Sequence, residues 1–286
     1  MGAITLVSSR PDRRYNEEDL ALAEDLAYRC ALAADNARLY RDRSEIASVL
    51  QRSLLPPHLP EIPGVEVGAE YLPMGEVNDV GGDFYDLIST VEDGWVCAIG
   101  DVRGKGVEAA SVTALARYTI RAVTLRNDRP SEVLAALNEA MLQQLSEDRF
   151  CTAACVRLEP ADGSTGVGMD VSRAGHPAPF LLRPDGLVEE VGCSGRVLGV
   201  FDDAELGDSS LRLMPGEALV LYTDGVTEAR SPDGEFFGDD GLRRLLGSCS
   251  GLDAADIAAS IKNVVLDFQK GDPRDDLAVL VLRAKA

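Results

Sequence analysis

A proline-rich segment divides this chain into two parts with different sequence patterns. Residues 54–64, LLPPHLPEIPG, hold four prolines, and proline lacks the backbone N–H that a continuing helix needs. Up to this segment the sequence predicts one long helix over residues 17–55. Beyond it, short apolar runs are separated by turn residues such as PADG and PDG, which is typical of β-strands. We therefore place a domain boundary at this segment or slightly upstream.

The first half of the predicted helix carries a seam of mostly small residues. They recur at alternating spacings of three and four, at Leu20, Ala23, Ala27, Cys30, Ala34 and Ala37. Such a seam lets another helix approach closely, and two interpretations stay open: the helix packs on its own domain, or it pairs with a second copy in a homodimer. A strand is also predicted over residues 4–9, ITLVSS. Because one strand and one helix cannot bury a core, we expect residues 1–43 to be the end of another domain.

The part beyond the prolines predicts an α+β fold. Strands are expected over residues 65–71, 82–88, 95–102, 151–159, 166–173, 179–183, 218–222 and 277–283. Helices are expected in two pairs, over residues 107–125 and 131–146, and over residues 239–247 and 254–269. Strands that bunch apart from paired helices favour antiparallel sheets over alternating βαβ units.

Charge and cysteine content exclude several classes of function. The chain has 28 basic and 48 acidic residues, a net charge of −20, so nucleic acid and anionic membrane surfaces are poor partners. Its six cysteines form no CxxC pair and it has two histidines, which disfavours a zinc site. The sequence shows no run of 18 apolar residues and no signal-peptide pattern. We expect a cytoplasmic protein in a reducing compartment.

Several aspartates stand at a predicted strand end or in a turn beside glycine. Asp83 in GGDFYD, Asp101 in IGDVRGKG and Asp224 in YTDGVTEAR each adjoin a hydrophobic strand, where an unpaired charge is costly. Asp275 and Asp276 directly precede the apolar run LAVLVL, and two adjacent carboxylates repel unless a cation lies between them and others. The stretches SPDGEFFG and PDG are instead predicted to be turns, since Asp-Gly is a common turn signal.

These aspartates together predict a metal site made of oxygen ligands alone. Hard oxygen ligands without histidine or cysteine suit Mn²⁺ or Mg²⁺. Two such ions that share a carboxylate can clamp a phosphoryl group and lower the pKa of a bridging water, which then attacks phosphorus without a protein nucleophile. The pattern therefore favours a metal-dependent phosphoryl hydrolase.

Three further residues have competing interpretations. The stretch GDVRGKG lacks the spacing of a nucleotide phosphate loop, because Gly106 stands where Ser or Thr is needed. Arg103 and Lys105 in that stretch either face a substrate phosphate or lie in a solvated turn. His176, followed directly by proline, is predicted to stabilise a turn rather than to act as a general base.

Taken in order, these motifs resemble the bacterial PPM-type phosphatases of the SpoIIE/RsbU group. The resemblance covers residues 44–286 and rests on LQRSLLPPHLPEIPGVEVGAEYLP, VGGDFYDLI, IGDVRGKGVEAA, AGHPAPFLL, RVLGVF, LVLYTDGVTEAR and RDDLAVLVL. Residues 1–43, with ITLVSSRPDRRYNEEDLALAEDLA and AADNARLY, look like the last strand and helix of a GAF sensor domain. The expected organisation is thus a truncated GAF-like segment over residues 1–43, a helical and proline-rich linker over 44–64, and a phosphatase domain over 65–286.

The resemblance implies a β-sandwich of two antiparallel sheets flanked by helices in α-β-β-α layers. It implies that one metal is held by Asp83, Asp101 and the backbone carbonyl of Val102. A second metal would be held by Asp101, Asp224 and the pair Asp275/Asp276, where alignment on related type 2C phosphatases favours Asp275. Substrates in this group are phosphoserine or phosphothreonine on small, STAS-type anti-sigma-factor antagonists, which capture an anti-sigma factor once dephosphorylated.

Two departures from type 2C phosphatases outside this group are visible. Arg103 stands where those enzymes have a histidine, and Asp79 stands where they have a phosphate-binding arginine. Phosphate recognition must then come from the metals or from other residues. The rival hypotheses are a catalytically silent phosphatase-like module that binds partners, against which the complete aspartate set argues, and another metal-dependent hydrolase such as a phosphodiesterase, which the lack of histidine ligands disfavours. The small-residue seam that runs into LQRSLLP also suggests the hypothesis that a dimerising N-terminal helix sets the position of the elements that carry Asp83 and Asp101.

Overall fold

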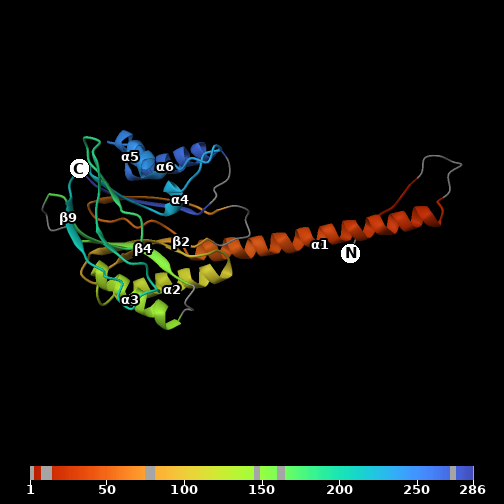
Figure 1. Cartoon of the computed structure of the whole chain (residues 1–286), viewed down its shortest axis with the longest axis horizontal. Helices are drawn as coiled ribbons and strands as arrows, with labels where there is room; N and C mark the ends of the chain where they lie inside the picture. The colour runs from red at the N-terminus through yellow and green to blue at the C-terminus, as the bar shows by residue number, and fades with distance from the viewer. Residues whose placement is uncertain are drawn as a thin grey trace.

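Two β-sheets packed face to face form the body of the protein, and helix α1 (Glu17–Ser53) projects from it (Figure 1). The computed structural model describes residues 3–7, 15–74, 81–144, 149–159, 165–270 and 275–285, and the side chains of residues 40 and 42–53 are not described. Helices cover the outer face of each sheet, so the expected α-β-β-α layers of an α+β fold are confirmed.

The two sheets have interleaved chain order. The first sheet runs β1-β11-β10-β6-β7, with bounds Val65–Leu72, Leu277–Ala284, Ala218–Tyr222, Phe180–Leu182 and Val188–Glu190. The second runs β2-β3-β4-β5-β8, with bounds Asp83–Ser89, Trp95–Val102, Cys151–Leu158, Val167–Ala174 and Cys193–Gly195, and β9 (Ser209–Leu213) pairs with β5. Among the described residues every strand pair is antiparallel except β5 with β8. The two predicted antiparallel sheets are confirmed, with this short parallel pair at the edge of the second.

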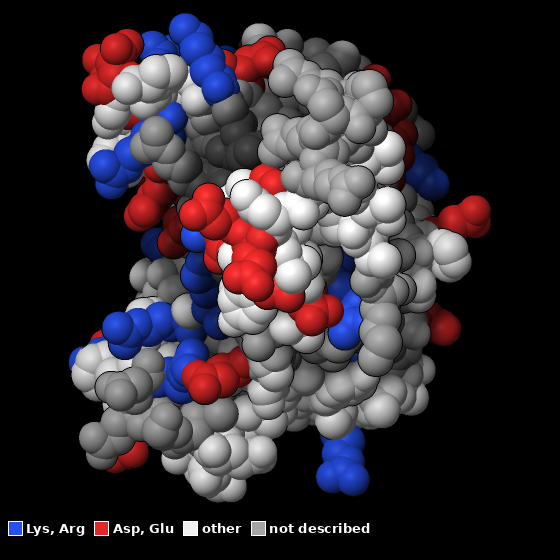
Figure 2. All heavy atoms as spheres, turned by 90° about the vertical axis from the view of Figure 1, so that its right-hand side faces the viewer, with Lys and Arg blue, Asp and Glu red and all other residues white. Residues whose placement is uncertain are grey.

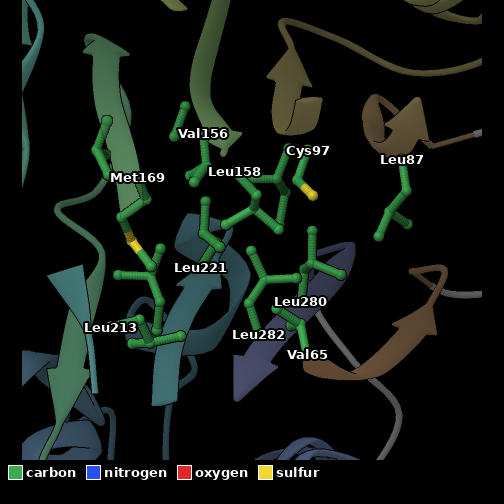
Figure 3. Packing of buried hydrophobic residues seen from close by; sticks show 14 of the residues in the cluster. Val65, Leu87, Cys97, Val156, Leu158, Met169, Leu213, Leu221, Leu280 and Leu282 are labelled. Atoms are coloured by element: carbon green, nitrogen blue, oxygen red, sulfur yellow. The ribbon is translucent and has the colours of Figure 1, made fainter. Parts of the chain in front are cut away.

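Successive side chains along the strands point to opposite faces of each sheet, and the buried ones form a core of three layers. Between the sheets, inward-facing residues such as Val156, Leu158, Leu221, Leu280 and Leu282 interlock (Figure 3). Helices α2 (Val107–Thr124) and α3 (Pro130–Gln144) cover the second sheet, while α5 (Gly238–Ser248) and α6 (Ala254–Gln269) cover the first. Strands β3, β10 and β11 are buried on both faces, which is why their sequences read as continuous apolar runs.

Helix α1 does not pack on the sandwich along its first half. Leu20, Leu26 and Leu32 are exposed, whereas Leu54, the residue after the last residue of the helix, contacts Ala110 and Ala114 of α2. In Figure 2 the molecule is viewed from the side toward which α1 projects, and acidic side chains lie near the middle of this view. This half therefore leaves its seam uncovered by the sandwich, and both interpretations, packing on its own domain and pairing with a second copy, stay open.

The strand predicted over residues 4–9 is not formed in its described portion. Residues 3–7 have no regular structure, and they are exposed. A strand needs a neighbouring strand to accept and donate its backbone hydrogen bonds, and none of the described strands pairs with residues 3–7. No helix in the part of the chain that the structure describes is both long and apolar enough to cross a membrane.

Candidate active site

Asp83 and Asp101 face each other across two neighbouring strands. Asp83 is the first residue of β2 and pairs in register with Asp101 near the end of β3. Asp83 is buried and Asp101 is half-buried. Like charges directly opposite each other destabilise a strand pair, so this arrangement needs compensation from a proton or a cation.

The other candidate carboxylates come from the facing sheet. Asp224 lies just beyond β10, at the start of the short helix α4 (Asp224–Thr227), and Asp275 and Asp276 directly precede β11. Strands β10 and β11 are antiparallel neighbours, so the end of one meets the start of the other at one edge. A Cβ atom at Gly225 would lie 1.8 Å from the Asp276 carbonyl oxygen and 3.5 Å from Asp275 Cβ, which shows how closely these two turns pack.

Asp276 ties the two sheets together. Its Oδ1 accepts a hydrogen bond from the Met74 N–H at 2.7 Å, and its Oδ2 accepts one from the Gly82 N–H at 2.9 Å. A side chain at Gly81 would place its Cβ 2.0 Å from Asp276 Oδ2, so the approach requires glycine there. Asp275, by contrast, has an exposed side chain whose Oδ1 accepts the Asp276 N–H at 2.9 Å.

Thr223 is a site residue that sequence reasoning missed. It is fully buried, and its hydroxyl donates a hydrogen bond to Asp83 Oδ2 at 2.6 Å. The Ala278 N–H donates in turn to Thr223 Oγ1 at 2.9 Å. The polar residue between the apolar run of β10 and Asp224 was the available signal, but its partners lie 140 and 55 residues away along the chain.

The carboxylates lie in a strongly anionic environment. Burial, followed by repulsion from neighbouring aspartates, raises the pKa of Asp101 to about 7 and that of Asp224 to about 6. Burial is also the main cause that raises the pKa of Asp83, Asp275 and Asp276. No lysine or arginine within the described ranges forms an ion pair with any of the five. Among the described residues the cluster therefore lacks a protein counter-charge.

The donor set fits a hard divalent cation. A Cβ at Gly82 would lie 2.1 Å from the Val102 carbonyl oxygen and 2.8 Å from Asp101 Oδ1, so these two oxygens converge beside the Gly82 backbone. All of the predicted ligands offer oxygen, which Mn²⁺ and Mg²⁺ prefer. Within the described residues, no group of three or more acidic, histidine or cysteine side chains is arranged so that it could already hold a metal ion. The donors form two groups, one on each sheet: Asp83, Asp101 and Val102, and Asp224 and Asp275.

The remaining predicted residues lie around this cluster. Arg103 follows β3, with its guanidinium 5.3 Å from the centre of the Phe150 ring, and both Arg103 and Lys105 are exposed. His176 is buried with Nδ1 2.9 Å from Thr152 Oγ1, and burial lowers its pKa to about 3, which disfavours a role as general base near neutral pH. The stretch SPDGEFFG forms the predicted turn, in which the Gly234 N–H donates to the Ser231 carbonyl. Asp79 lies outside the described residues.

Comparison with known families agrees with this architecture. Residues 92–285 match the family model described as Stage II sporulation protein E (SpoIIE). The chain belongs to the SpoIIE family. The matched range includes β3 to β11 and all of the candidate carboxylates except Asp83. It does not reach residues 1–43, so the GAF assignment stays a prediction.

Individual relatives extend the match upstream. The chain is 28% identical to phosphoserine phosphatase RsbU of Bacillus subtilis over 242 residues, covering 84% of this chain and 70% of RsbU. It is 30% identical to protein IcfG of Synechocystis over 224 residues, but spans 34% of that protein's length.

Solved structures show the same fold. The RsbU and RsbW domains of Rv1364c from Mycobacterium tuberculosis align with a TM-score of 0.68 at 27% identity, covering 79% of this chain and 62% of that one. The SiaA-PP2C domain of Pseudomonas aeruginosa aligns with a TM-score of 0.72 at 24% identity, over 88% of this chain and 99% of that one. This SpoIIE-family chain therefore has the PP2C-type phosphatase fold of the RsbU group.

Proposed function

We propose that this chain is a metal-dependent protein serine/threonine phosphatase that hydrolyses phosphoserine or phosphothreonine on a small regulatory protein. The observation that carries the proposal is the gathering of five aspartates from two sheets at one end of the sandwich, with no lysine or arginine paired to them in the described part of the chain. Two bound Mn²⁺ or Mg²⁺ ions would supply an activated water and neutralise the charge of the phosphoryl group.

The hydrogen bonds support a division of roles within the Asp275/Asp276 pair. Both oxygens of Asp276 already accept backbone N–H groups, and its side chain is buried. Asp275 is exposed and lies beside the Asp224 turn. We therefore assign Asp275 as a ligand with Asp83, Asp101, Asp224 and the Val102 carbonyl, and Asp276 as the residue that holds the site's backbone together.

The substrate class rests on the relatives. RsbU and a second Bacillus subtilis relative, RsbP, are named phosphoserine phosphatases. We propose a phosphorylated, STAS-type anti-sigma-factor antagonist as the substrate and the cytoplasm as the location. Arg103 and Lys105 are exposed beside the strand that delivers Asp101, which supports contact with the substrate phosphate in place of the missing arginine at position 79.

Dimerisation through α1 is part of the proposal. The apolar side chains of its first half, including Leu20, Leu26 and Leu32, are exposed in the single chain. A parallel or antiparallel partner helix that packs along the seam would cover Leu20, whereas Leu26 and Leu32 point to other sides of the helix. The alternative function, a catalytically silent module that binds the same partner, shares this fold and differs only in lacking turnover.

Phosphate release tests the proposal. The assay follows Mn²⁺-dependent release from a phosphoserine protein and from p-nitrophenyl phosphate, for the wild type, Asp101→Ala and Asp185→Ala. Asp185 is a matched control because it is an exposed aspartate in the turn between β6 and β7, where its Oδ1 accepts the Leu187 N–H. We expect Asp101→Ala to lose activity and Asp185→Ala to keep it. If wild type and Asp101→Ala release phosphate equally, the catalytic proposal is wrong.

A further inference from the structure

Thr223 connects the two halves of the candidate site. It follows β10 in the first sheet, whereas its acceptor Asp83 opens β2 in the second. Both side chains are buried, so water does not compete for this hydrogen bond. The bond is also short for a hydroxyl and a carboxylate, at 2.6 Å.

The direction of the Thr223 hydroxyl is set by its second partner. A threonine hydroxyl has one hydrogen to donate and accepts through its lone pairs. The Ala278 N–H donates to Thr223 Oγ1 at 2.9 Å, and the Thr223 N–H donates to the Ala278 carbonyl at 3.0 Å. The Ala278 carbonyl lies 3.4 Å from Oγ1, much farther than Asp83 Oδ2. The hydroxyl hydrogen is therefore directed at Asp83.

The bond leaves one face of the Asp83 carboxylate for other partners. Its Oδ2 is engaged by Thr223, while Asp101 lies directly opposite across the strand pair. A free carboxylate rotates about its Cβ–Cγ bond. A hydrogen bond that holds one oxygen restricts this rotation, so the position of the other oxygen is fixed as well. Oδ1 of Asp83 is then the oxygen that the hydrogen bond with Thr223 does not use.

We infer that Thr223 is a positioning residue, whose hydroxyl orients the Asp83 carboxylate so that it can bind the divalent metal. This inference rests on the proposed metal-dependent function. Residues that orient a metal ligand through a hydrogen bond contribute roughly 10- to 100-fold to metal affinity. Thr223 does not itself contact the metal or the substrate in this assignment.

Two substitutions at position 223 separate the hydroxyl from the packing. Thr223→Val keeps the shape and removes the hydroxyl, whereas Thr223→Ser keeps the hydroxyl and removes a methyl group. Thr124→Val is the control, since Thr124 is also a buried threonine but its Oγ1 has no hydrogen-bond partner in the described part of the chain. Mn²⁺ affinity is measured by calorimetry on the whole chain, below the melting temperature of every variant, and compared with KM for Mn²⁺ and with kcat.

The expected result is a loss of Mn²⁺ affinity of about 10-fold or more for Thr223→Val, and less than about threefold for Thr223→Ser and Thr124→Val. In an Asp83→Ala background, Thr223→Val should cause no further loss, because the carboxylate that it orients is absent. For Thr223→Val, the fold-decrease in kcat at saturating Mn²⁺ should be smaller than the fold-increase in KM for Mn²⁺.

Three outcomes overturn the inference. One is a Thr223→Val variant that binds Mn²⁺ within twofold of the wild type. Another is a Thr223→Ser variant with a 10-fold loss of Mn²⁺ affinity, since the methyl group would then matter rather than the hydroxyl. This outcome also decides the question if the Thr223→Val variant does not fold. The third is an additive loss in the Asp83→Ala background. A wild type that shows no saturable Mn²⁺ binding would instead contradict the proposed function itself.

Discussion

Asp86 on β2 and Arg117 on α2 form an ion pair in the interior, with Arg117 Nη2 3.1 Å from Asp86 Oδ2 and the two side chains 0% and 8% exposed. Arg121, one turn along α2, adds two hydrogen bonds of 2.7 Å to the same carboxylate. The pair fastens α2 to the strand whose first residue is Asp83.

Replacing Asp86 by alanine should be strongly destabilising. Arg117 would lose the carboxylate with which it pairs in the interior, and breaking a buried pair by removing one partner costs about 3–5 kcal/mol. Urea unfolding followed by circular dichroism measures the change. Glu190→Gln is a suitable control, because its pair with Arg243 is solvent-exposed and such pairs contribute at most about 1 kcal/mol. Equal effects of the two substitutions would contradict the assignment of Asp86 as a buried anchor.

His176 should make stability depend on pH. Burial lowers its pKa to about 3, whereas an unfolded histidine has a pKa of about 6.5. Below about pH 6.5 the unfolded state therefore binds a proton that the folded state does not, and the free energy of unfolding falls by about 1.4 kcal/mol for each further pH unit until about pH 3. This contribution to stability is fully present above pH 6.5.

The comparison of His176→Asn with the wild type isolates this effect. Asparagine can replace the contact of Nδ1 with Thr152 without titrating. Urea unfolding at pH 7.5, 6.0 and 5.0 should show a steeper loss for the wild type than for the variant. His58, the other histidine, is exposed, so His58→Gln should keep the wild-type slope. Parallel slopes for the wild type and His176→Asn would show that His176 is not buried in the neutral form.

Asp275→Ala and Asp276→Ala should fail in different ways. Removal of Asp276 leaves the Met74 and Gly82 N–H groups without their acceptor, and hydrogen bonds to a charged group contribute about 1.5–3 kcal/mol each. We expect a large loss of stability in EDTA for Asp276→Ala, and little loss but no Mn²⁺ response for Asp275→Ala. Thermal unfolding with EDTA and then with Mn²⁺ measures both. The reverse assignment is indicated if Asp275→Ala keeps the full Mn²⁺-dependent rise in melting temperature.

Charges introduced into the α1 seam should disrupt dimers. Ala27 and Ala34 lie in the projecting half of the helix, away from the sandwich. Ala27→Glu with Ala34→Glu would place like charges at a close helix–helix contact, so the dimer fraction in sedimentation velocity should fall. The same substitutions should leave the melting temperature of the sandwich unchanged. An unchanged dimer fraction and activity would count against pairing through α1.

The main strands and helices could be predicted because their signals are local. The strand predicted over residues 95–102 agrees with β3, and the helix over residues 254–269 agrees with α6, since both carry continuous or periodic apolar patterns. The three-residue strands β7 and β8 were missed because a segment so short carries no period. The strand predicted over residues 4–9 was wrong where it is described, since β-propensity without a neighbouring strand does not make a sheet.

The gathering of the candidate residues was predictable to the extent that they adjoin an end of an apolar strand. Asp83, Asp101 and Asp224 each show that pattern, and the structure brings them to one end of the sandwich. The choice between Asp275 and Asp276 was not predictable, because it depends on which of two adjacent side chains turns toward the Gly82 N–H across the sheets. Thr223 was missed because its hydrogen-bond partners, Asp83 and Ala278, come from distant parts of the chain.

Because the candidate ligands are divided between two sheets, the distances between them depend on the position of one sheet relative to the other. Asp83 and Asp101 move with β2 and β3, whereas Asp224 and Asp275 move with β10 and β11. A slide of one sheet over the other by a fraction of a residue would separate the two groups without breaking a single strand pair. We therefore expect a shear of the sandwich, for example by a pull on α2 or β2, to lower the proposed metal affinity while the strand pairs within each sheet stay intact.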